Sequence, residues 1–288
     1  MKFLSRLKLN YLTRAMLMVF AVVAVLAASA SPATTAPLPP PDTIARSAVL
    51  IDADDNGALF GKNENEVVPP ASTTKIMTAI LALESGKLDQ PITISQNAVS
   101  VEPSVLGLHM GDQITMREAL TGMMIVSGND AAVAIAETIA GSVPAFANMM
   151  NEKAKELGAT NTHFVNPNGL TEPDHYSTAH DMALIASYAM KNPEFRHIVS
   201  LKDYNVQYMD GHTEYVTTTN HFLESGFKGA NGIKTGFTNA AGDCLVASAT
   251  RGQKTLIAVF YNDDDRWTDA PAWLEYGFSY YTKDELGE

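Results

Sequence analysis

The sequence of 288 residues has little cysteine, few basic residues for its acidic content, and only one long apolar run. Its single cysteine, Cys244, allows no intramolecular disulfide and excludes structural zinc sites that need two or more cysteines. The 20 Lys and Arg against 32 Asp and Glu give a net charge of −12. Nucleic acid is therefore not an expected partner, because binding phosphates needs a basic footprint. With 46% apolar residues, the chain still has ample material for a packed core.

The first 30 residues are typical of a secretory signal peptide. Residues 1–14 carry four basic and no acidic side chains, and residues 15–28 are an unbroken apolar run. A membrane span needs about 20 apolar residues, so this run favours export over retention as an anchor. We expect cleavage after Ala30, with Ala36 as the alternative; removing residues 1–30 leaves 258 residues with a net charge of −16.

The signal predicts an exported protein of the periplasm or cell envelope, and an uncleaved signal is the only route to membrane association that we expect. Residues 31–42 are rich in Pro, Ala and Thr and are typical of a linker. Residues 43–288 are expected to form a single domain.

Periodicity predicts strands near both ends of this domain and helices in its middle. The expected strands cover 47–52, 58–62, 202–219, 233–238, 244–250 and 255–262. The expected helices cover 72–84, 115–126, 130–140, 144–157 and 178–191, with a last one from about residue 269. Residues 161–177 have no periodicity and are expected to form a long loop. This order predicts an α+β fold in which one antiparallel β-sheet, built from both chain ends, packs against a helical cluster.

The sequence Ser72-Thr73-Thr74-Lys75 places a serine at a predicted helix start and a lysine one turn later on the same face. A serine nucleophile needs an adjacent base, and a lysine can serve when burial or a second cation lowers its pKa. The helix N-terminus also favours a developing oxyanion. The S-x-x-K pattern is common, however, and recurs at Ser225–Lys228. On its own it is compatible with acyl transfer but does not establish it.

Two further motifs carry residues suited to the same chemistry. Ser127-Gly128-Asn129 lies in a break between two predicted helices, where it either presents a hydroxyl and an amide to a cleft or caps the second helix. Lys234-Thr235-Gly236 lies in a predicted strand, where it either binds a carboxylate or protects a sheet edge. In the order S-x-x-K, S-x-N, K-T-G, the three motifs match a signature of serine acyl-enzymes.

With these motifs, the stretches Ala48–Ala79, Lys234–Thr250 and Tyr276–Phe278 resemble the low-molecular-weight penicillin-binding proteins, the serine-type D-Ala-D-Ala carboxypeptidases. The resemblance covers roughly residues 42–281. It implies the penicillin-binding protein/β-lactamase-like transpeptidase fold and an enzyme that removes the terminal D-alanine from peptidoglycan stem peptides. It also implies covalent inhibition by β-lactam antibiotics, and it implies no cofactor.

The resemblance further implies the roles of single residues. Ser72 is the expected nucleophile, Lys75 the general base for acylation, and Ser127 the relay that passes the proton to the leaving D-alanine. Five residues are expected to bind the substrate. Asn129 is expected to hold the substrate backbone, Lys234 and Thr235 to bind its carboxylate, and Gly236 to allow a close approach. The backbone N–H of Phe237 is expected to form an oxyanion hole with that of Ser72. Lys234 is also expected to keep Lys75 neutral.

Some positions depart from the family pattern. Where some relatives have an arginine near the substrate carboxylate, this sequence has His221. Arg266 is another candidate for binding that carboxylate, but the adjacent Asp263–Asp265 predict that it belongs to a solvated charge cluster. Class A β-lactamases have Asp where Gly128 stands, and the surroundings of Glu102 do not match their deacylating loop, so fast deacylation is not expected. A D,D-endopeptidase, a β-lactamase and a non-catalytic muropeptide- or penicillin-binding protein remain alternatives.

No metal site is expected. The seven histidines are scattered, and His175 and His180 do not have the spacing of a ligand pair on one helical face. Cys244 lies inside a predicted strand and is expected to be buried and unreactive.

Overall fold

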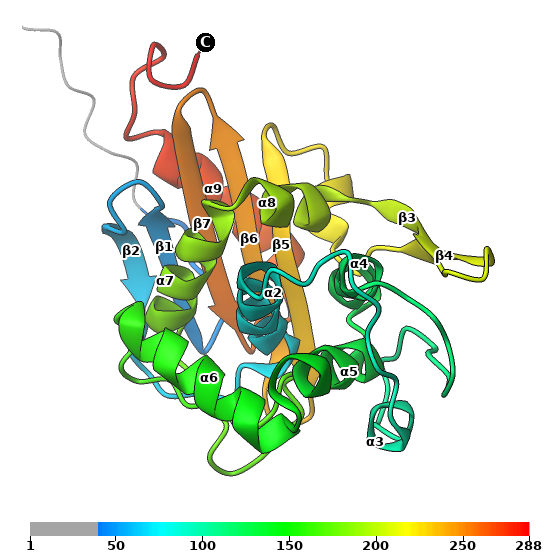
Figure 1. Ribbon diagram of the computed structural model, residues 1–288. Helices are drawn as coiled ribbons and strands as arrows, with labels where there is room; N and C mark the ends of the chain where they lie inside the picture. Colours follow the sequence, from blue (N-terminus) through cyan, green and yellow to red (C-terminus); the bar gives the residue numbers. More distant parts are fainter. Residues whose placement is uncertain (1–39, 288) are drawn as a thin grey trace, which may run out of the picture. The chain divides into compact units, whose positions relative to one another are not determined.

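The fold is built on a five-stranded antiparallel sheet whose strand order is β2-β1-β7-β6-β5 (Figure 1). The computed structural model describes residues 40–287, so the expected signal peptide (1–30) and most of the linker (31–42) lie outside the described residues and stay predictions. The strands are β1 (Ser47–Asp52), β2 (Ala58–Lys62), β5 (Ala230–Thr238), β6 (Gly242–Arg251) and β7 (Lys254–Tyr261). Because β1 pairs with β7, both ends of this part of the chain meet in one sheet, which confirms the predicted α+β arrangement.

Helices cover both faces of this sheet (Figure 1). Alternating side chains of each strand point to opposite faces. Val49 and Val259 join the core under the helical cluster, whereas Leu50 and Ala258 join a second core against Trp273 of α9 (Arg266–Phe278). The cluster consists of η1 (Ala71–Thr74), α2 (Lys75–Glu84), α3 (Gln96–Val99), α4 (Met116–Val126), α5 (Asn129–Ala140), α6 (Val143–Glu156), α7 (Ala179–Met190) and α8 (Pro193–Ser200).

Most predicted elements are present, with boundaries shifted by a few residues. The side chains of Thr115 and Thr178 cap α4 and α7, since each accepts a hydrogen bond from the third following backbone N–H. The strand signals over 202–219 form a separate two-stranded sheet of β3 (Asp203–Gln207) and β4 (Thr213–Thr217), followed by η2 (His221–Glu224). The helices α3 and α8 were not predicted.

No single helix within residues 40–287 is long and apolar enough to cross a membrane, and the one pair that reaches the required length and composition, α5 with α6, is bent by 85°.

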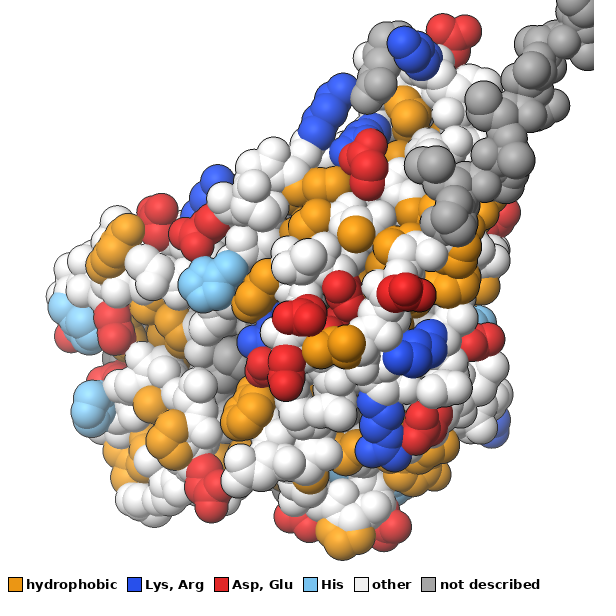
Figure 2. Space-filling model, turned by 180° about the vertical axis from the view of Figure 1, so that it is seen from behind, with side chains coloured by type: hydrophobic (Ala, Val, Ile, Leu, Met, Phe, Trp, Pro, Cys, Tyr) orange, Lys and Arg blue, Asp and Glu red, His pale blue; other side chains and the backbone are white. Residues whose placement is uncertain are grey.

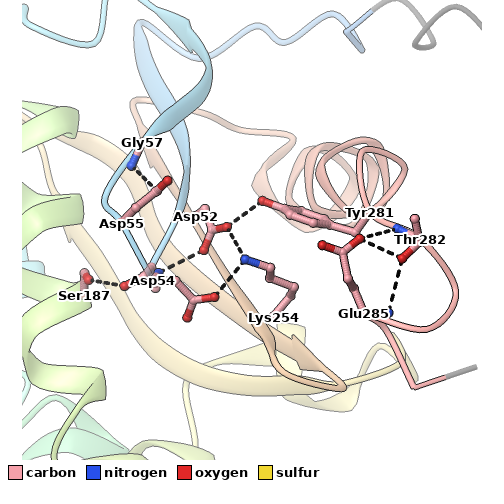
Figure 3. A network of polar contacts seen from close by, with 10 residues as sticks. Asp52, Asp54, Asp55, Gly57, Ser187, Lys254, Tyr281, Thr282 and Glu285 are labelled. Atoms are coloured by element: carbon pink, nitrogen blue, oxygen red, sulfur yellow. Dashed lines mark hydrogen bonds and ion pairs between the residues drawn. The ribbon is translucent and has the colours of Figure 1, made fainter.

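A polar network ties the C-terminal segment to the sheet (Figure 3). The buried carboxylate of Asp52 accepts hydrogen bonds from the Tyr281 hydroxyl at 2.7 Å, the Lys254 ammonium at 3.1 Å and the Asp54 backbone N–H at 2.9 Å. Burial alone would raise the pKa of Asp52, but these hydrogen bonds outweigh it and hold the pKa below its usual value. The network therefore stabilises the charged form of a buried acid.

Tyr281→Phe should lower the free energy of unfolding by about 1–2 kcal/mol, because it removes a hydrogen bond to a charged, buried group. The folded pKa of Asp52 is depressed, so this contribution is present above the unfolded pKa and is lost as the pH falls through the folded one. Denaturant unfolding from pH 7 down to about pH 3 measures it. The matched control is Tyr215→Phe in the exposed β3–β4 hairpin. An equal effect of both substitutions, or a Tyr281 effect that grows below pH 4, would contradict the assignment.

Candidate active site

The S-x-x-K serine lies at the start of the predicted buried helix. The first turn is the 3-10 helix η1, which contains Ser72, and α2 continues from Lys75. Ala71, before the serine, has a left-handed φ of 49° although it is not glycine. Strain of this kind is often found at functional sites. Ser72 is half-buried and lines a cleft of about 440 Å³.

Lys75 lies directly below Ser72 and is completely buried. Its Nζ donates to Ser72 Oγ at 2.9 Å, to Asn129 Oδ1 at 2.7 Å and to the backbone oxygen of Asn168 at 2.7 Å. None of these three acceptors is charged. The ammonium form of Lys75 is thus hydrogen-bonded but unpaired with any carboxylate at contact distance among residues 40–287.

The second motif bridges α4 and α5. Ser127 ends α4 with a left-handed φ of 64°, and Gly128, not Ser127, is the residue that caps α5. Both Ser127 and Asn129 line the cleft. A Cβ at Gly128 would lie 2.9 Å from the backbone nitrogen of Leu106, so an aspartate at this position, as in class A β-lactamases, would not fit without a shift.

The next residue, Asp130, shapes the cleft rim and was missed by the sequence reasoning. Its carboxylate accepts hydrogen bonds from the backbone N–H groups of Leu106, Gly107 and Leu108. Asn129 holds the same rim from the other side, since its Nδ2 donates to the backbone oxygen of Glu102 at 2.8 Å. The segment 102–108 is therefore fixed by Asn129 and Asp130, the two residues that follow Ser127-Gly128.

The third motif lies on β5, an edge strand of the sheet. Lys234 is buried, 1% exposed, and so is not a solvated guard of the sheet edge. Its Nζ donates to the backbone oxygen of Thr235 at 3.0 Å, and the Thr235 hydroxyl contacts that of Thr219 at 2.7 Å. A Cβ at Gly236 would lie 3.1 Å from the backbone nitrogen of Ser72, so a larger residue there would require a small shift of β5 away from Ser72.

Both buried lysines have lowered pKa values. Burial lowers the pKa of Lys75 well below its usual value, the positive charge of Lys234 lowers it further, and Asp130 opposes the shift. Burial lowers the pKa of Lys234 to about 7. A neutral Lys75 is therefore accessible at ordinary pH, which is the condition for a lysine to act as a base.

The loop over 161–177 supplies a group that the sequence reasoning did not find. The backbone oxygen of Asn168 is the third acceptor of Lys75. Gly169 packs so tightly against η1 that a Cβ there would lie 1.8 Å from the backbone oxygen of Ala71. The sequence Asn166-Pro167-Asn168-Gly169 signals a turn, but nothing in it indicates where that turn docks.

Comparison with known proteins shows the family of the chain. The sequence model of the D-alanyl-D-alanine carboxypeptidase family (peptidase S11) matches residues 33–265. The chain belongs to this family. Its members are serine hydrolases of the D-Ala-D-Ala carboxypeptidase class, as the resemblance implied, and the S-x-x-K, S-x-N and K-T-G residues described above are those expected of such an enzyme.

Individual relatives agree with this assignment. The chain is 41% identical over 248 residues to D-alanyl-D-alanine carboxypeptidase DacF of Bacillus subtilis, covering 82% of this chain and 63% of that protein. It is 34% identical over 268 residues to DacB2 of Mycobacterium tuberculosis, covering 90% of each. The Streptomyces K15 DD-transpeptidase has a similar structure, with a TM-score of 0.79, 35% identity, and coverage of 84% of this chain and all of that one.

The wall of the cleft formed by His221 and Arg266 differs in part from the expectation. His221 and Arg266 both line the cleft, and Arg266 is ion-paired with Asp243 and lies over the Trp267 ring at 4.8 Å. The predicted solvated cluster at 263–265 is only partly right: Asp264 and Asp265 are exposed, but Asp263 is completely buried where the chain turns into α9. Burial, with Asp269 nearby, raises the pKa of Asp263 to about 7. Arg266 itself lines the cleft, held by its ion pair with Asp243.

The charges at the cleft are cationic. Figure 2 shows the molecule from behind, and on this face Lys and Arg side chains are scattered among acidic and apolar ones. None of the described residues that line the cleft is acidic, while Lys75 and Lys234 lie beneath it and Arg266 forms its wall. Attraction to an anionic substrate is therefore local.

The remaining candidates lie outside this chemistry. No group of three or more His, Cys, Asp or Glu side chains within residues 40–287 could hold a metal ion. Cys244 is buried in β6 as predicted, and burial raises the pKa of its thiol to about 12, which makes it unreactive.

Proposed function

We propose that the chain is a D-Ala-D-Ala carboxypeptidase that forms an acyl-enzyme on Ser72 and releases the terminal D-alanine of peptidoglycan stem peptides. The observation that carries this proposal is the 2.9 Å contact between Lys75 Nζ and Ser72 Oγ, made by a completely buried lysine beside a second buried lysine. A serine and a base within hydrogen-bond reach, with the base held neutral, are the requirements of nucleophilic acyl transfer.

The hydrogen-bond partners of Lys75 set the direction in which it can take a proton. The ammonium form has three N–H groups, and a neutral amine has two N–H groups and one lone pair. The oxygens of Asn129 and Asn168 can only accept, so they take the two N–H groups of the neutral amine. The lone pair then faces the Ser72 hydroxyl, which can donate. The two carbonyl oxygens thus orient the base toward the nucleophile.

Acylation then follows with a balanced transfer of one proton. Ser72 Oγ attacks the carbonyl of the terminal D-Ala-D-Ala peptide bond while Lys75 takes its proton. The backbone N–H groups of Ser72 and Phe237 stabilise the oxyanion, and the approach of Gly236 to Ser72 supports this pairing. As the C–N bond breaks, the proton passes through Ser127 to the leaving nitrogen. Water then hydrolyses the ester and restores Ser72.

The substrate carboxylate has several cationic and hydroxyl partners within the cleft. Thr235 lines the cleft, Lys234 lies directly beneath it, and Arg266 is placed on its wall. We assign the carboxylate to Thr235 and Lys234, with Arg266 as an additional charge. Asn129 contacts the substrate backbone, because its side chain lines the cleft and is held rigidly by Glu102 and Lys75.

Two features favour slow release of β-lactams over the β-lactamase alternative. None of the described cleft-lining residues is acidic, and the exposed Glu102 contributes only its backbone oxygen to Asn129. Glu102 and Glu172 line an adjoining hollow, so no carboxylate of residues 40–287 lines the cleft around Ser72 to activate a deacylating water for the penicillin ester. β-Lactams, which acylate the same serine, should act as inhibitors that persist on the protein.

Mass spectrometry of the products tests the reaction. Incubation with a pentapeptide ending in D-Ala-D-Ala should yield a tetrapeptide and free D-alanine, and cross-linked muropeptide dimers should remain dimers. Conversion of dimers to monomers with the pentapeptide intact would instead identify a D,D-endopeptidase. Labelled penicillin bound without covalent attachment, with neither peptide changed, would identify a non-catalytic binding protein.

Lys234→Met should weaken acylation by about 10- to 100-fold, because a charged partner of the carboxylate is lost. It should also move the acid limb of the acylation rate toward higher pH. The charge of Lys234 lowers the pKa of Lys75, so its removal raises that pKa and leaves more Lys75 protonated. Penicillin acylation rates measured from pH 5 to 9 check this, with Lys234→Arg as the charge-retaining control. An unmoved limb in Lys234→Met would show that Lys234 does not act on Lys75.

We also propose that residues 1–30 direct export, so that the domain acts in the cell envelope, where the family's substrate lies. The proposal rests on the sequence, since these residues lie outside the described part. The mass of the protein recovered from the envelope should correspond to a chain that begins at Ser31. A protein that retains residues 1–30 and fractionates with membranes would support the anchor instead.

A further inference from the structure

The loop that carries the Asn168 oxygen is attached to the nucleophile-bearing helices at several points. The Thr78 hydroxyl of α2 donates to the backbone oxygen of Pro167 at 2.6 Å. Gly169 packs on the backbone of Ala71, as described above. Inside the loop, Asn166 Oδ1 accepts from the backbone N–H of Gly169 at 2.7 Å and so closes the turn. A third attachment comes from a histidine that the proposed chemistry does not use.

That histidine is His175, which is buried with 3% exposure. The backbone N–H of Val165 donates to its Nδ1 at 3.1 Å, so Nδ1 carries no proton and the proton resides on Nε2. Nε2 then donates to the Thr74 hydroxyl at 2.8 Å. Thr74 lies between Ser72 and Lys75 in sequence, so the imidazole joins the start of the loop directly to the S-x-x-K turn.

The surroundings keep this imidazole neutral and fixed. Its ring packs edge-on against Phe164 with centroids 5.5 Å apart. Burial, with His163 nearby, lowers the pKa of His175 to about 4, so the neutral form with both hydrogen bonds persists at physiological pH. The residue before His175 is Asp174, and its backbone oxygen lies 2.6 Å from His163 Nδ1.

We propose that His175 is a positioning residue for Lys75: by bridging Thr74 and Val165 it holds the Asn168 oxygen on Lys75 Nζ and so orients the base toward Ser72. This inference rests on the proposed function, because it assumes that Lys75 is the base for acylation. It extends the S-x-x-K site by a residue 100 positions away from Lys75 that touches neither the substrate nor the reacting atoms.

The hydrogen bond between His175 and Thr74 can be removed from either side. In His175→Asn, the amide oxygen can still accept from Val165, but nothing reaches Thr74. In Thr74→Val, the hydroxyl that accepts from Nε2 is lost with little change in volume. Thr74→Ser keeps that hydroxyl and serves as the conservative rescue. His163→Asn is the matched control, because it removes a histidine from the same loop without touching the bridge.

The readout is the second-order rate of penicillin acylation of the full-length protein as a function of pH, with thermal unfolding measured in parallel. We expect His175→Asn and Thr74→Val each to lower the rate by about 10- to 100-fold, as expected for a misplaced base. The acid limb should move to lower pH, because the charged form of Lys75 loses an acceptor and its pKa falls further. This shift is opposite to the one expected for Lys234→Met.

A double-mutant cycle completes the test. Because both substitutions break the same bridge, the double variant should be acylated no more slowly than either single variant. Thr74→Ser and His163→Asn should keep the wild-type acylation rate and the wild-type position of its acid limb. Folded variants with an unmoved acid limb and a wild-type rate would overturn the positioning role, even if their unfolding temperatures fall. Additive losses would also overturn it. If the wild-type protein itself is never acylated, the proposed function fails instead.

Discussion

Ser72→Ala should leave no covalent adduct with labelled penicillin and should lower the release of D-alanine by about six orders of magnitude, the loss typical of removing a serine nucleophile. The reason is chemical and not structural. Alanine is accommodated at a half-buried position on the cleft, and the oxygen that forms the ester is gone. Gel fluorescence after denaturation measures the adduct, and pentapeptide turnover measures the hydrolysis.

The second S-x-x-K sequence of the mature chain provides a matched control for this prediction. Ser225 lies at the end of η2, and its Oγ donates to the backbone oxygen of Phe222 at 2.7 Å. Ser225→Ala should therefore leave both labelling and turnover close to wild type. Persistent labelling of Ser72→Ala, or loss of labelling in Ser225→Ala alone, would mean that the wrong motif has been assigned.

Lys75→Ala should lower the rate of acylation by about 10²- to 10⁴-fold, the contribution expected of a general base. The substitution removes the group 2.9 Å from Ser72 Oγ that accepts its proton. Lys75→Arg should not restore the rate, because a guanidinium stays protonated at all accessible pH values and cannot act as a base. Time courses of penicillin acylation at pH 7 to 9 provide the measurement.

Lys228→Ala, in the second S-x-x-K sequence, serves as the control and should react at the wild-type rate. If Lys75→Ala is acylated nearly as fast as the wild type while remaining folded, the proton of Ser72 leaves by another route. In that case the orienting role assigned to the oxygens of Asn129 and Asn168 fails with it.

Most of the fold could be predicted because its elements carry strong local signals. Strands β1, β6 and β7 alternate between two apolar cores, and α2 is apolar on nearly all sides because it runs through the centre. The missed helix α8 had signals as well, an Asn192 cap and Pro193 in the first turn. It is only eight residues long, which is too short for a helical periodicity of apolar residues to be recognised.

The nucleophile region could be predicted because side-chain types at fixed spacing identify it. Ser72, Lys75, Ser127 and Asn129 are brought together as their order in the sequence suggested. The Asn168 oxygen could not be found in this way, because every residue has a backbone carbonyl and only tertiary packing selects one. The place of Arg266 could not be predicted for a related reason: Asp264 and Asp265 are exposed as expected, and only the fold buries Asp263 and brings Arg266 to the cleft.

The central claim, that Ser72 is the nucleophile of an acyl-enzyme, is tested most directly by locating the penicillin adduct. Trypsin cleaves after Lys62 and Lys75, so Ser72 lies in the peptide 63–75, apart from Ser127 and Ser225. We predict that the mass of one opened penicillin appears on this peptide and that fragmentation assigns it to Ser72. An adduct on any other peptide, or on Thr73 or Thr74, would contradict the account.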